Sequence, residues 1–424
     1  MANQDPPPFV HVDAATEASA RRRGSDPREL ERCTEAVLRR VYACLPAAPP
    51  HAAAAALLAA LPGPDPSGED RLSALPSPLL HDIVARLPPR DAARTAALSR
   101  PRRPVWRGEP LVLADVHLLP GGPRQPRRAD TPALAAAVSR ALAAHPGPFR
   151  AVHLVCGYMG AHQRQLARWA RTLADKGVQE LVLVNRPWPL NVPLPAELLD
   201  AAALTRLYLG VWRFPDTSAL PRRAAPLFPV LRELVLCSVV IESRDMEFLL
   251  AGCPVLETFG MLGSRAKGMR LRLAGPRLRC VQICVYIVES IAVVDAPNLE
   301  RLLLHRSVTP DGPCIGLKIG NAPKLRLLGY LEPGIHMMEI RDTVITAGVR
   351  ASPRNMVASV KILSLNVRFG VLNDVKMLPA FLRCFPNVET LYIVVLKKLT
   401  KSVASSISRS EMRLARSNAS RPSR

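Results

Sequence analysis

The sequence predicts an α/β fold in which short parallel strands follow one another along an array, with helical segments between them. Three observations support this prediction. A six-residue pattern, one apolar residue, two variable residues and then apolar–variable–apolar, occurs ten times between Phe149 and Ile393. Successive starts lie 29, 26, 27, 25, 22, 21, 26, 35 and 28 residues apart. Six of the ten copies carry a proline two residues before the pattern.

The ten copies share apolar residues at positions one, four and six, which are expected to face the core. They read FRAVHL (149), VQELVL (178), LTRLYL (204), LRELVL (231), LETFGM (256), LRCVQI (278), LERLLL (299), LRLLGY (325), VKILSL (360) and VETLYI (388). This pattern at a period of about 20–29 residues is the signature of leucine-rich repeats. Such repeats form a horseshoe of parallel strands and helices, which presents an extended binding surface and no catalytic pocket.

The prolines mark the corner between helix and strand, because proline cannot continue a helix and biases its neighbour toward extended geometry. They are Pro229, Pro254, Pro276, Pro297, Pro323 and Pro386. Helices are expected at 27–42, 131–144, 162–177, 245–254 and 377–386, and a first strand within 111–119. Gly177 stands where a helix-terminating glycine belongs. The 35-residue spacing after position 325 predicts an irregular repeat over 331–360.

Composition divides the chain into four segments. Residues 1–70 form a Pro/Ala-rich extension that is partly helical, and 71–107 form a compact helical block. The repeats cover 110–396. The last segment, 397–424, is rich in Ser and Arg and has a net charge of +7. Because it has almost no large apolar residues, disorder is predicted there, and also for residues 1–25.

The whole chain has a net charge of +22, which raises nucleic-acid binding as one interpretation. The distribution argues against it, because outside the tail the charge is spread thinly and aromatic residues make up only 4% of the chain. Many of the arginines stand beside repeat strands, as do Arg206, Arg232, Arg279 and Arg301. A basic nucleic-acid-associated protein remains an alternative.

The sequence contains neither a secretory signal nor an apolar run of the length that a membrane span needs. Its nine cysteines have no disulfide or zinc spacing, and Cys280 and Cys284 are expected on one face of a strand, compatible with an apolar core. An intracellular protein with buried thiols is the expectation.

The sequence lacks the phosphate-loop, dinucleotide, zinc-protease and hydrolase motifs. Its histidines are scattered, and His153 and His305 are expected to be hydrogen-bonded structural residues of the strands. No catalytic residue, cofactor or metal is predicted.

The block 72–107 reads LSALPSPLLHDIVARLPPRDAARTAALSRPRRPVW. A stripe of apolar residues at helical spacing crosses it, and such a short hairpin cannot bury that surface alone. The block resembles the F-box in its LP, LL, I and LP elements and in its following helix. Together with the repeats, it resembles the grass-type F-box/leucine-rich-repeat proteins of plants.

This resemblance implies a non-catalytic subunit of an SCF-type ubiquitin ligase. The F-box would bind a Skp-type adaptor and through it a cullin, and the repeats would bind a protein substrate of unknown identity. The implied adaptor contacts are Leu75, Pro76, Leu79, Leu80, Ile83, Leu87 and Leu98.

The block departs from the family pattern after Ser99. Arg102 stands where the family has its first Trp, and Pro101 interrupts the helix that carries it. Two alternatives follow: a repeat scaffold whose F-box no longer binds the adaptor, or a helical cap on the array. The chain also carries its basic tail where many relatives continue into the further C-terminal segment called FBD.

Overall fold

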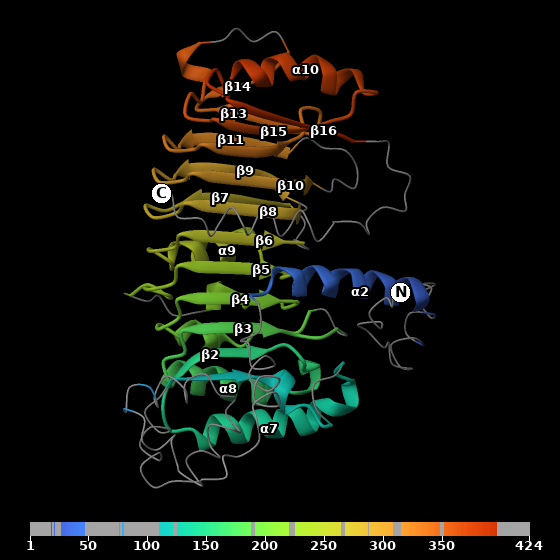
Figure 1. Ribbon diagram of the computed structural model, residues 1–424, viewed down its shortest axis with the longest axis vertical. Coiled ribbons are helices and arrows are strands. Elements are labelled where there is room, and N and C mark those ends of the chain that lie inside the picture. Colours follow the sequence, from blue (N-terminus) through green and yellow to red (C-terminus); the bar gives the residue numbers. More distant parts are fainter. Residues whose placement is uncertain are drawn as a thin grey trace, which may run out of the picture. The chain divides into compact units, whose positions relative to one another are not determined.

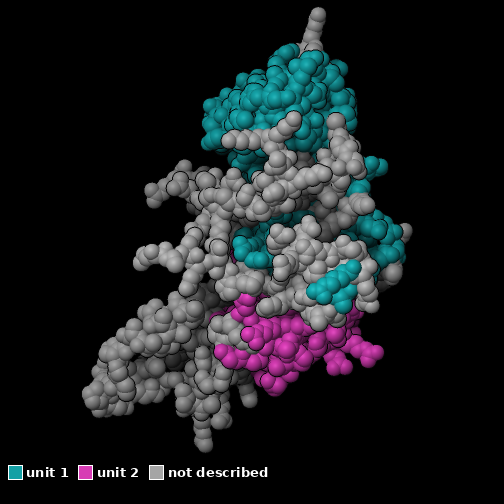
Figure 2. Space-filling view, turned by 90° about the vertical axis from the view of Figure 1, so that its right-hand side faces the viewer, with its two compact units in different colours: residues 1–44, 210–424 teal, residues 45–209 magenta. Residues whose placement is uncertain are grey.

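The computed structural model describes residues 18, 21, 27–46, 76, 79, 110–121, 125–187, 191–219, 225–263, 268–286, 288–307, 315–347 and 352–396. Two compact units divide the chain. Unit 1 comprises residues 1–44 and 210–424, and unit 2 comprises residues 45–209 (Figure 2). The predicted segments 1–25 and 400–424 lie almost wholly outside the described residues.

Unit 2 is built on parallel strands that lie in the order of the sequence. The strands are β1 (Leu111–Ala114), β2 (Phe149–Leu154), β3 (Glu180–Val184) and β4 (Arg206–Gly210). Its helices α7 (Thr131–Ala144) and α8 (Gln163–Asp175) contact each other (Figure 1). Single 3-10 turns complete it: Asp115–Leu118, Arg128–Asp130, Met159–Ala161 and Ala196–Asp200.

Unit 1 carries the longer run of parallel repeat strands, again in sequence order. They are β5 (Glu233–Cys237), β6 (Thr258–Leu262), β8 (Cys280–Tyr286), β10 (Arg301–Ser307), β12 (Leu327–Leu331), β15 (Ile362–Val367) and β16 (Thr390–Val395). Its helices are α2 (Pro27–Cys44), α9 (Ser243–Ala251) and α10 (Leu372–Arg383), and its 3-10 turns are Thr217–Ala219 and Pro353–Asn355.

The α/β prediction is confirmed, because each of the ten pattern copies contains a strand. Position four of the pattern is fully buried in the middle copies, as at Leu234, Leu302 and Leu363. Helix α8 buries its predicted apolar face and is followed by Gly177 in the left-handed region, at φ +60°. Glycine adopts that conformation without the steric cost of a Cβ atom.

Neighbouring repeats are joined by a regular main-chain hydrogen bond at position two of the pattern. The carbonyl oxygen of Arg232 accepts from the amides of both Glu257 and Thr258, each at 2.9 Å. The same arrangement recurs along unit 1 at the carbonyls of Glu257, Arg279, Glu300, Arg326 and Lys361. These contacts belong to the backbone and therefore do not depend on the side chain at that position.

A second sheet in unit 1 corrects the expectation of helices between the strands. It consists of β7 (Met269–Ala274), β9 (Val288–Asp295), β11 (Ile315–Asn321), β13 (His336–Ile340) and the short antiparallel β14 (Thr343–Val344). Repeats of only 21 and 22 residues leave little room for a helix of several turns, whereas a strand spans the same distance with fewer residues. The irregular repeat predicted over 331–360 contains β13 and β14.

The last repeat also departs from expectation. Leu391 and Ile393 occupy core positions of the pattern, yet each is 41% exposed, whereas Leu363 and Leu365 on β15 are fully buried. Within the described part of the chain, β16 is the end strand of its sheet, so no neighbour covers these side chains. Leu391 and Ile393 pair with the buried Leu363 and Leu365 and so lie on the core side of the sheet, but the burial expected for this copy is not found.

Candidate functional surface

Positions three and five of the pattern define the candidate functional surface, called the strand face below. Side chains alternate along a strand, so these positions point away from the core that positions four and six fill. In unit 1 the strand face comprises Glu233, Val235, Thr258, Gly260, Cys280, Gln282, Arg301, Leu303, Leu327, Gly329, Ile362, Ser364, Thr390 and Tyr392, of which Cys280, Gly329 and Ser364 are buried. Such a mixed, extended surface suits a macromolecular partner.

The strand face of unit 1 carries little charge. Among its described positions Glu233 is the one acid and Arg301 the one base. A surface that binds a phosphate backbone needs several lysines or arginines together. The strand face of this unit therefore favours a protein partner over a nucleic acid.

The basic residues that flank the strands are engaged with acids of the next repeat. Arg232 lies 3.1 Å from Glu257, and Arg279 lies 2.8 Å from Glu300. Because these side chains are largely exposed, each pair contributes at most about 1 kcal/mol to stability. Each of these two arginines is thus paired with an acid of the next repeat.

In unit 2 one acid joins three successive strands. Glu180 on β3 lies 3.0 Å from His153 Nε2 on β2 and 3.0 Å from Arg206 on β4. The hydrogen bond with His153 holds the pKa of Glu180 below its usual value, with Arg206 adding to the effect. His153 is thus the hydrogen-bonded structural residue that the sequence predicts, while His305 packs edge-on against Tyr330 with ring centres 5.1 Å apart.

The described thiols have the properties of structural cysteines. The described cysteines form no disulfide, and Cys156, Cys237, Cys253, Cys280 and Cys384 are buried, as the sequence predicts. Cys280 and Cys284 share the face of β8 opposite to Val281 and Ile283, and Cys280 is buried there at 7% exposure while Cys284 is partly buried. Burial raises the pKa of Cys284 to about 12, so this thiol stays protonated at neutral pH and is a poor nucleophile.

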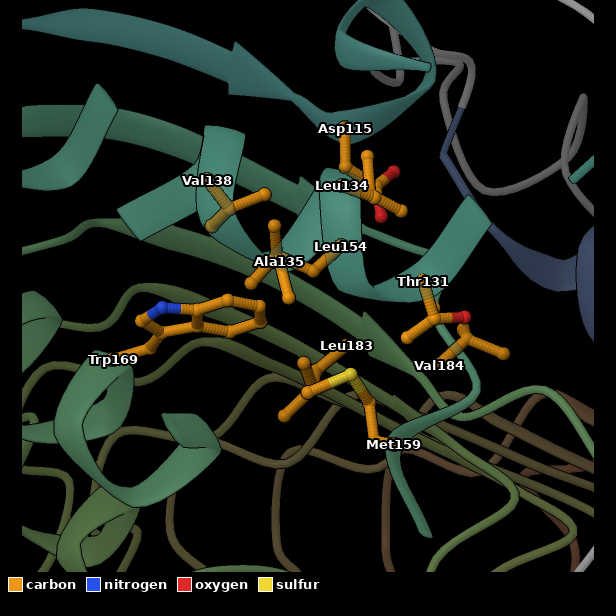
Figure 3. A pocket seen from close by; sticks show the side chains of 11 residues that line it. Asp115, Thr131, Leu134, Ala135, Val138, Leu154, Met159, Trp169, Leu183 and Val184 are labelled. Atoms are coloured by element: carbon orange, nitrogen blue, oxygen red, sulfur yellow. The ribbon is translucent and has the colours of Figure 1, made fainter. Parts of the chain in front are cut away.

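A small cavity in unit 2 lies between α7, α8 and the strands (Figure 3). Asp115 lines it, and one of its oxygens accepts from the amides of Val155 and Cys156, each at 2.9 Å. Burial raises the pKa of this carboxyl group despite those bonds. The cavity measures about 10 Å³, enough for one water molecule, whereas ligand sites occupy about 300–1,000 Å³.

The other cavity of note, beneath α9 in unit 1, is equally small at about 10 Å³ and lined mostly by apolar residues such as Leu250 and Phe259. In the part of the chain that the structure describes, no group of His, Cys, Asp or Glu is arranged to hold a metal ion. Among the described helices, none has the length and apolar character to cross a bilayer.

Of the seven predicted adaptor contacts, Pro76 and Leu79 are described. Both are exposed, Leu79 to 51%, and its amide donates to the Pro76 carbonyl at 3.0 Å. The remaining five lie outside the described residues: Leu75, Leu80, Ile83, Leu87 and Leu98. The sequence predicts the strand β16 but not the exposure of its apolar side chains. The one sequence feature related to that exposure is that β16 belongs to the last copy of the pattern.

Comparison with known proteins places the repeats in a family. Residues 166–393, more than half of the chain, match the family model described as FBD-associated F-box protein At5g56370, LRR repeats. This range contains nine of the ten pattern copies.

The individual relatives have either low sequence identity to this chain or a short matched segment. The Arabidopsis thaliana F-box/LRR-repeat protein At3g59200 is 30% identical over 192 residues, which cover 44% of this chain and 36% of that protein. F-box/LRR-repeat protein At3g26922 from the same plant is 27% identical over 61% of this chain and 74% of its own length. The rice MEIOTIC F-BOX protein MOF is 49% identical over 61 residues, 14% of this chain and 13% of that protein. By its repeats, the chain belongs to the F-box/leucine-rich-repeat family of plant proteins.

Proposed function

We propose that this protein is the substrate-recruiting subunit of an SCF-type ubiquitin ligase. Residues 71–107 bind a Skp-type adaptor, which in turn binds a cullin, and the strand face binds a protein substrate. The chain performs no chemistry itself, and ubiquitin transfer belongs to the partner enzymes. The relatives named F-box/LRR-repeat proteins support this assignment.

The observation that carries the proposal is the combination of an F-box-like block with a strand face that has few charges. The two cavities described above are each too small for a substrate molecule, and the described residues contain no metal cluster. Exposure of Leu79 and Pro76 supports the adaptor contact, because a docking side chain must be accessible before it binds.

The test is co-purification with a Skp-type adaptor. Leu75→Ala together with Pro76→Ala removes two apolar anchors, each worth about 2 kcal/mol or more in a typical interface. We expect the double variant to lose the adaptor while the thermal unfolding of the repeats stays nearly unchanged. Val230→Ala, at an exposed apolar residue within the repeats, is the matched control and should retain the adaptor.

A second variant separates the proposal from its closest alternative. Pro101→Arg with Arg102→Trp restores the family pattern and should tighten adaptor binding. If the natural chain does not bind and the restored variant does, the protein is a repeat scaffold with a non-functional F-box. If neither binds, residues 71–107 are only a cap on the array.

A further inference from the structure

Strand β12 contains a bulge that changes which of its side chains faces the core. Its register against β15 shifts between Leu328 and Leu331, so that two residues, Gly329 and Tyr330, stand opposite the single residue Ser364. Leu328 and Leu331 are both fully buried. In a regular strand one residue separates two side chains on the same face, whereas here there are two. Leu331 therefore fills the core place that position six of the pattern assigns to Tyr330.

The bulge presents Tyr330 on the strand face. Its ring lies edge-on against the ring of His305 on β10, with ring centres 5.1 Å apart and planes at 76°. His305 follows the fully buried Leu304, so by alternation it points away from the core. Tyr330 is half-buried, whereas position six of the preceding and following copies, Leu304 and Leu365, is fully buried. The expectation that position six faces the core is wrong for this copy.

Three side chains of β10 and β12 form what we call the bulge patch: Leu303, His305 and Tyr330. Leu303 lies on the same face of β10 as His305 and is half-buried. It pairs in register with Gly329, which has no side chain to cover it. The bulge patch therefore combines an aliphatic side chain with two rings and contains no residue of fixed charge.

We infer that Tyr330 determines which substrate the strand face accepts, by packing against an apolar side chain of that substrate. This inference rests on the proposed function, which makes the strand face the substrate surface. Bulges re-aim single side chains and occur preferentially next to functional sites. Tyrosine is enriched among the residues that carry most of the energy of an interface, because its ring buries a large area and its hydroxyl can still form a hydrogen bond.

The chemistry of the substrate contact follows from the charges around the bulge patch. Recognition of a phosphorylated or strongly acidic segment uses a cluster of arginines. Arg301 is the one base among the described positions three and five of unit 1, and it stands on β10 four residues before His305. A neutral segment with an aliphatic or aromatic side chain suits this part of the strand face better.

A library of random peptides displayed on phage and selected on the full chain tests the inference. The selected peptides should share an aliphatic or aromatic residue. Tyr330→Ala should weaken their binding at least about tenfold, whereas Tyr330→Phe, which keeps the ring, should weaken it less than about threefold. Met337→Ala, at an exposed apolar residue of β13 in the second sheet, is the matched control and should bind as the wild type does.

A second variant leaves Tyr330 in place. Leu303→Gln puts a polar group into the bulge patch and should weaken peptide binding at least about threefold, and it decides the question if Tyr330→Ala does not fold. Circular dichroism and thermal unfolding verify the fold of each variant. A purely structural Tyr330 would lower the unfolding temperature and leave peptide binding unchanged.

The outcomes separate this inference from the proposed function. Adaptor co-purification should be the same for the wild type and all four variants, because none changes residues 71–107. A chain that does not retain the adaptor contradicts the proposed function, whatever peptides it binds. Peptides that bind equally to the variants of Tyr330 and Leu303, peptides that share only charged residues, or a selection without any binder would each overturn the role of Tyr330.

Discussion

Arg368 holds Asp374 through both nitrogens of one edge of its guanidinium group. Nε donates to Oδ2 and Nη2 to Oδ1, each at 2.8 Å, and the Arg368 amide donates to Oδ2 at 3.1 Å. Asp374 is 1% exposed and lies in the first turn of α10, where the helix dipole favours a negative charge. The pair fixes the turn from β15 into the last helix.

Removing the arginine side chain should therefore be costly. Arg368→Ala leaves a buried carboxylate without its main partner, and we expect it to lower the free energy of unfolding by about 3 kcal/mol. Lys376→Ala, at an exposed position on α10, is the control and should change it by less than about 0.5 kcal/mol. Urea unfolding measures both, and equal values would contradict the structural role of the pair.

Gly329 should not accept a larger residue. A Cβ atom there would lie 2.6 Å from Cβ of Ser364 on β15, closer than real Cβ contacts occur. Overpacking of this kind costs about 1–3 kcal/mol. Gly370→Ala meets no atom within 4 Å and serves as the control. Thermal unfolding measures both variants. If Gly329→Ala and Gly370→Ala unfold at the same temperature, or if adding Ser364→Gly does not restore the stability lost in Gly329→Ala, the steric explanation is wrong.

His336 should make unit 1 sensitive to mild acid. Burial lowers its pKa to about 4, and its Nδ1 accepts from the Glu332 amide at 2.8 Å, so the folded state keeps the ring neutral. Since the folded pKa lies below the unfolded value of 6.5, this stability is fully present above pH 6.5. It declines as the pH falls toward 4, by up to about 3 kcal/mol in all.

The variant His336→Asn checks this assignment. Its amide oxygen can accept the same hydrogen bond but does not titrate, so the stability of the variant should vary less between pH 6.5 and 4.5. Urea unfolding at several pH values gives the two slopes. Identical slopes for wild type and variant would exclude His336 as the source.

Substitution at position four of the pattern should lower stability much more in β15 than in the neighbouring β16. Leu363 is fully buried and Leu391 is 41% exposed, although both stand at position four. Leu363→Ala should cost about 2–5 kcal/mol through the cavity it leaves. Leu391→Ala should cost about 1 kcal/mol or less. Comparable costs would mean that β16 is covered on both sides.

The strands and several helices could be predicted because their signals are local. Apolar residues at fixed spacing define each repeat strand, and Leu166, Trp169 and Leu173 outline the buried face of α8 before its glycine stop. Helix α10 begins at Leu372 and not near Met377, because its first turn is held by the pairing of Asp374 with Arg368, which apolar periodicity does not reveal.

The second sheet had a weaker but readable signal. Met269, Leu271 and Leu273 alternate with arginines, as expected of a half-buried strand, within a repeat too short for a long helix. The exposure of Leu391 had no such signal, because burial at that position depends on which strand comes next to it. The strand face and its low charge could be predicted from the residue types at positions three and five, but the ion pairs of Arg232 and Arg279 with acids of the next repeat could not, because they depend on how neighbouring repeats stack.

The doubly accepting carbonyl at position two of six repeats in unit 1 has a consequence for recognition. Since the backbone itself holds one repeat to the next, the spacing of the strands does not depend on the side chains that face a partner. Positions three and five can therefore change in shape and polarity from one protein to another while the frame stays the same. Binding to a new target therefore requires substitutions at positions three and five and no change of the backbone.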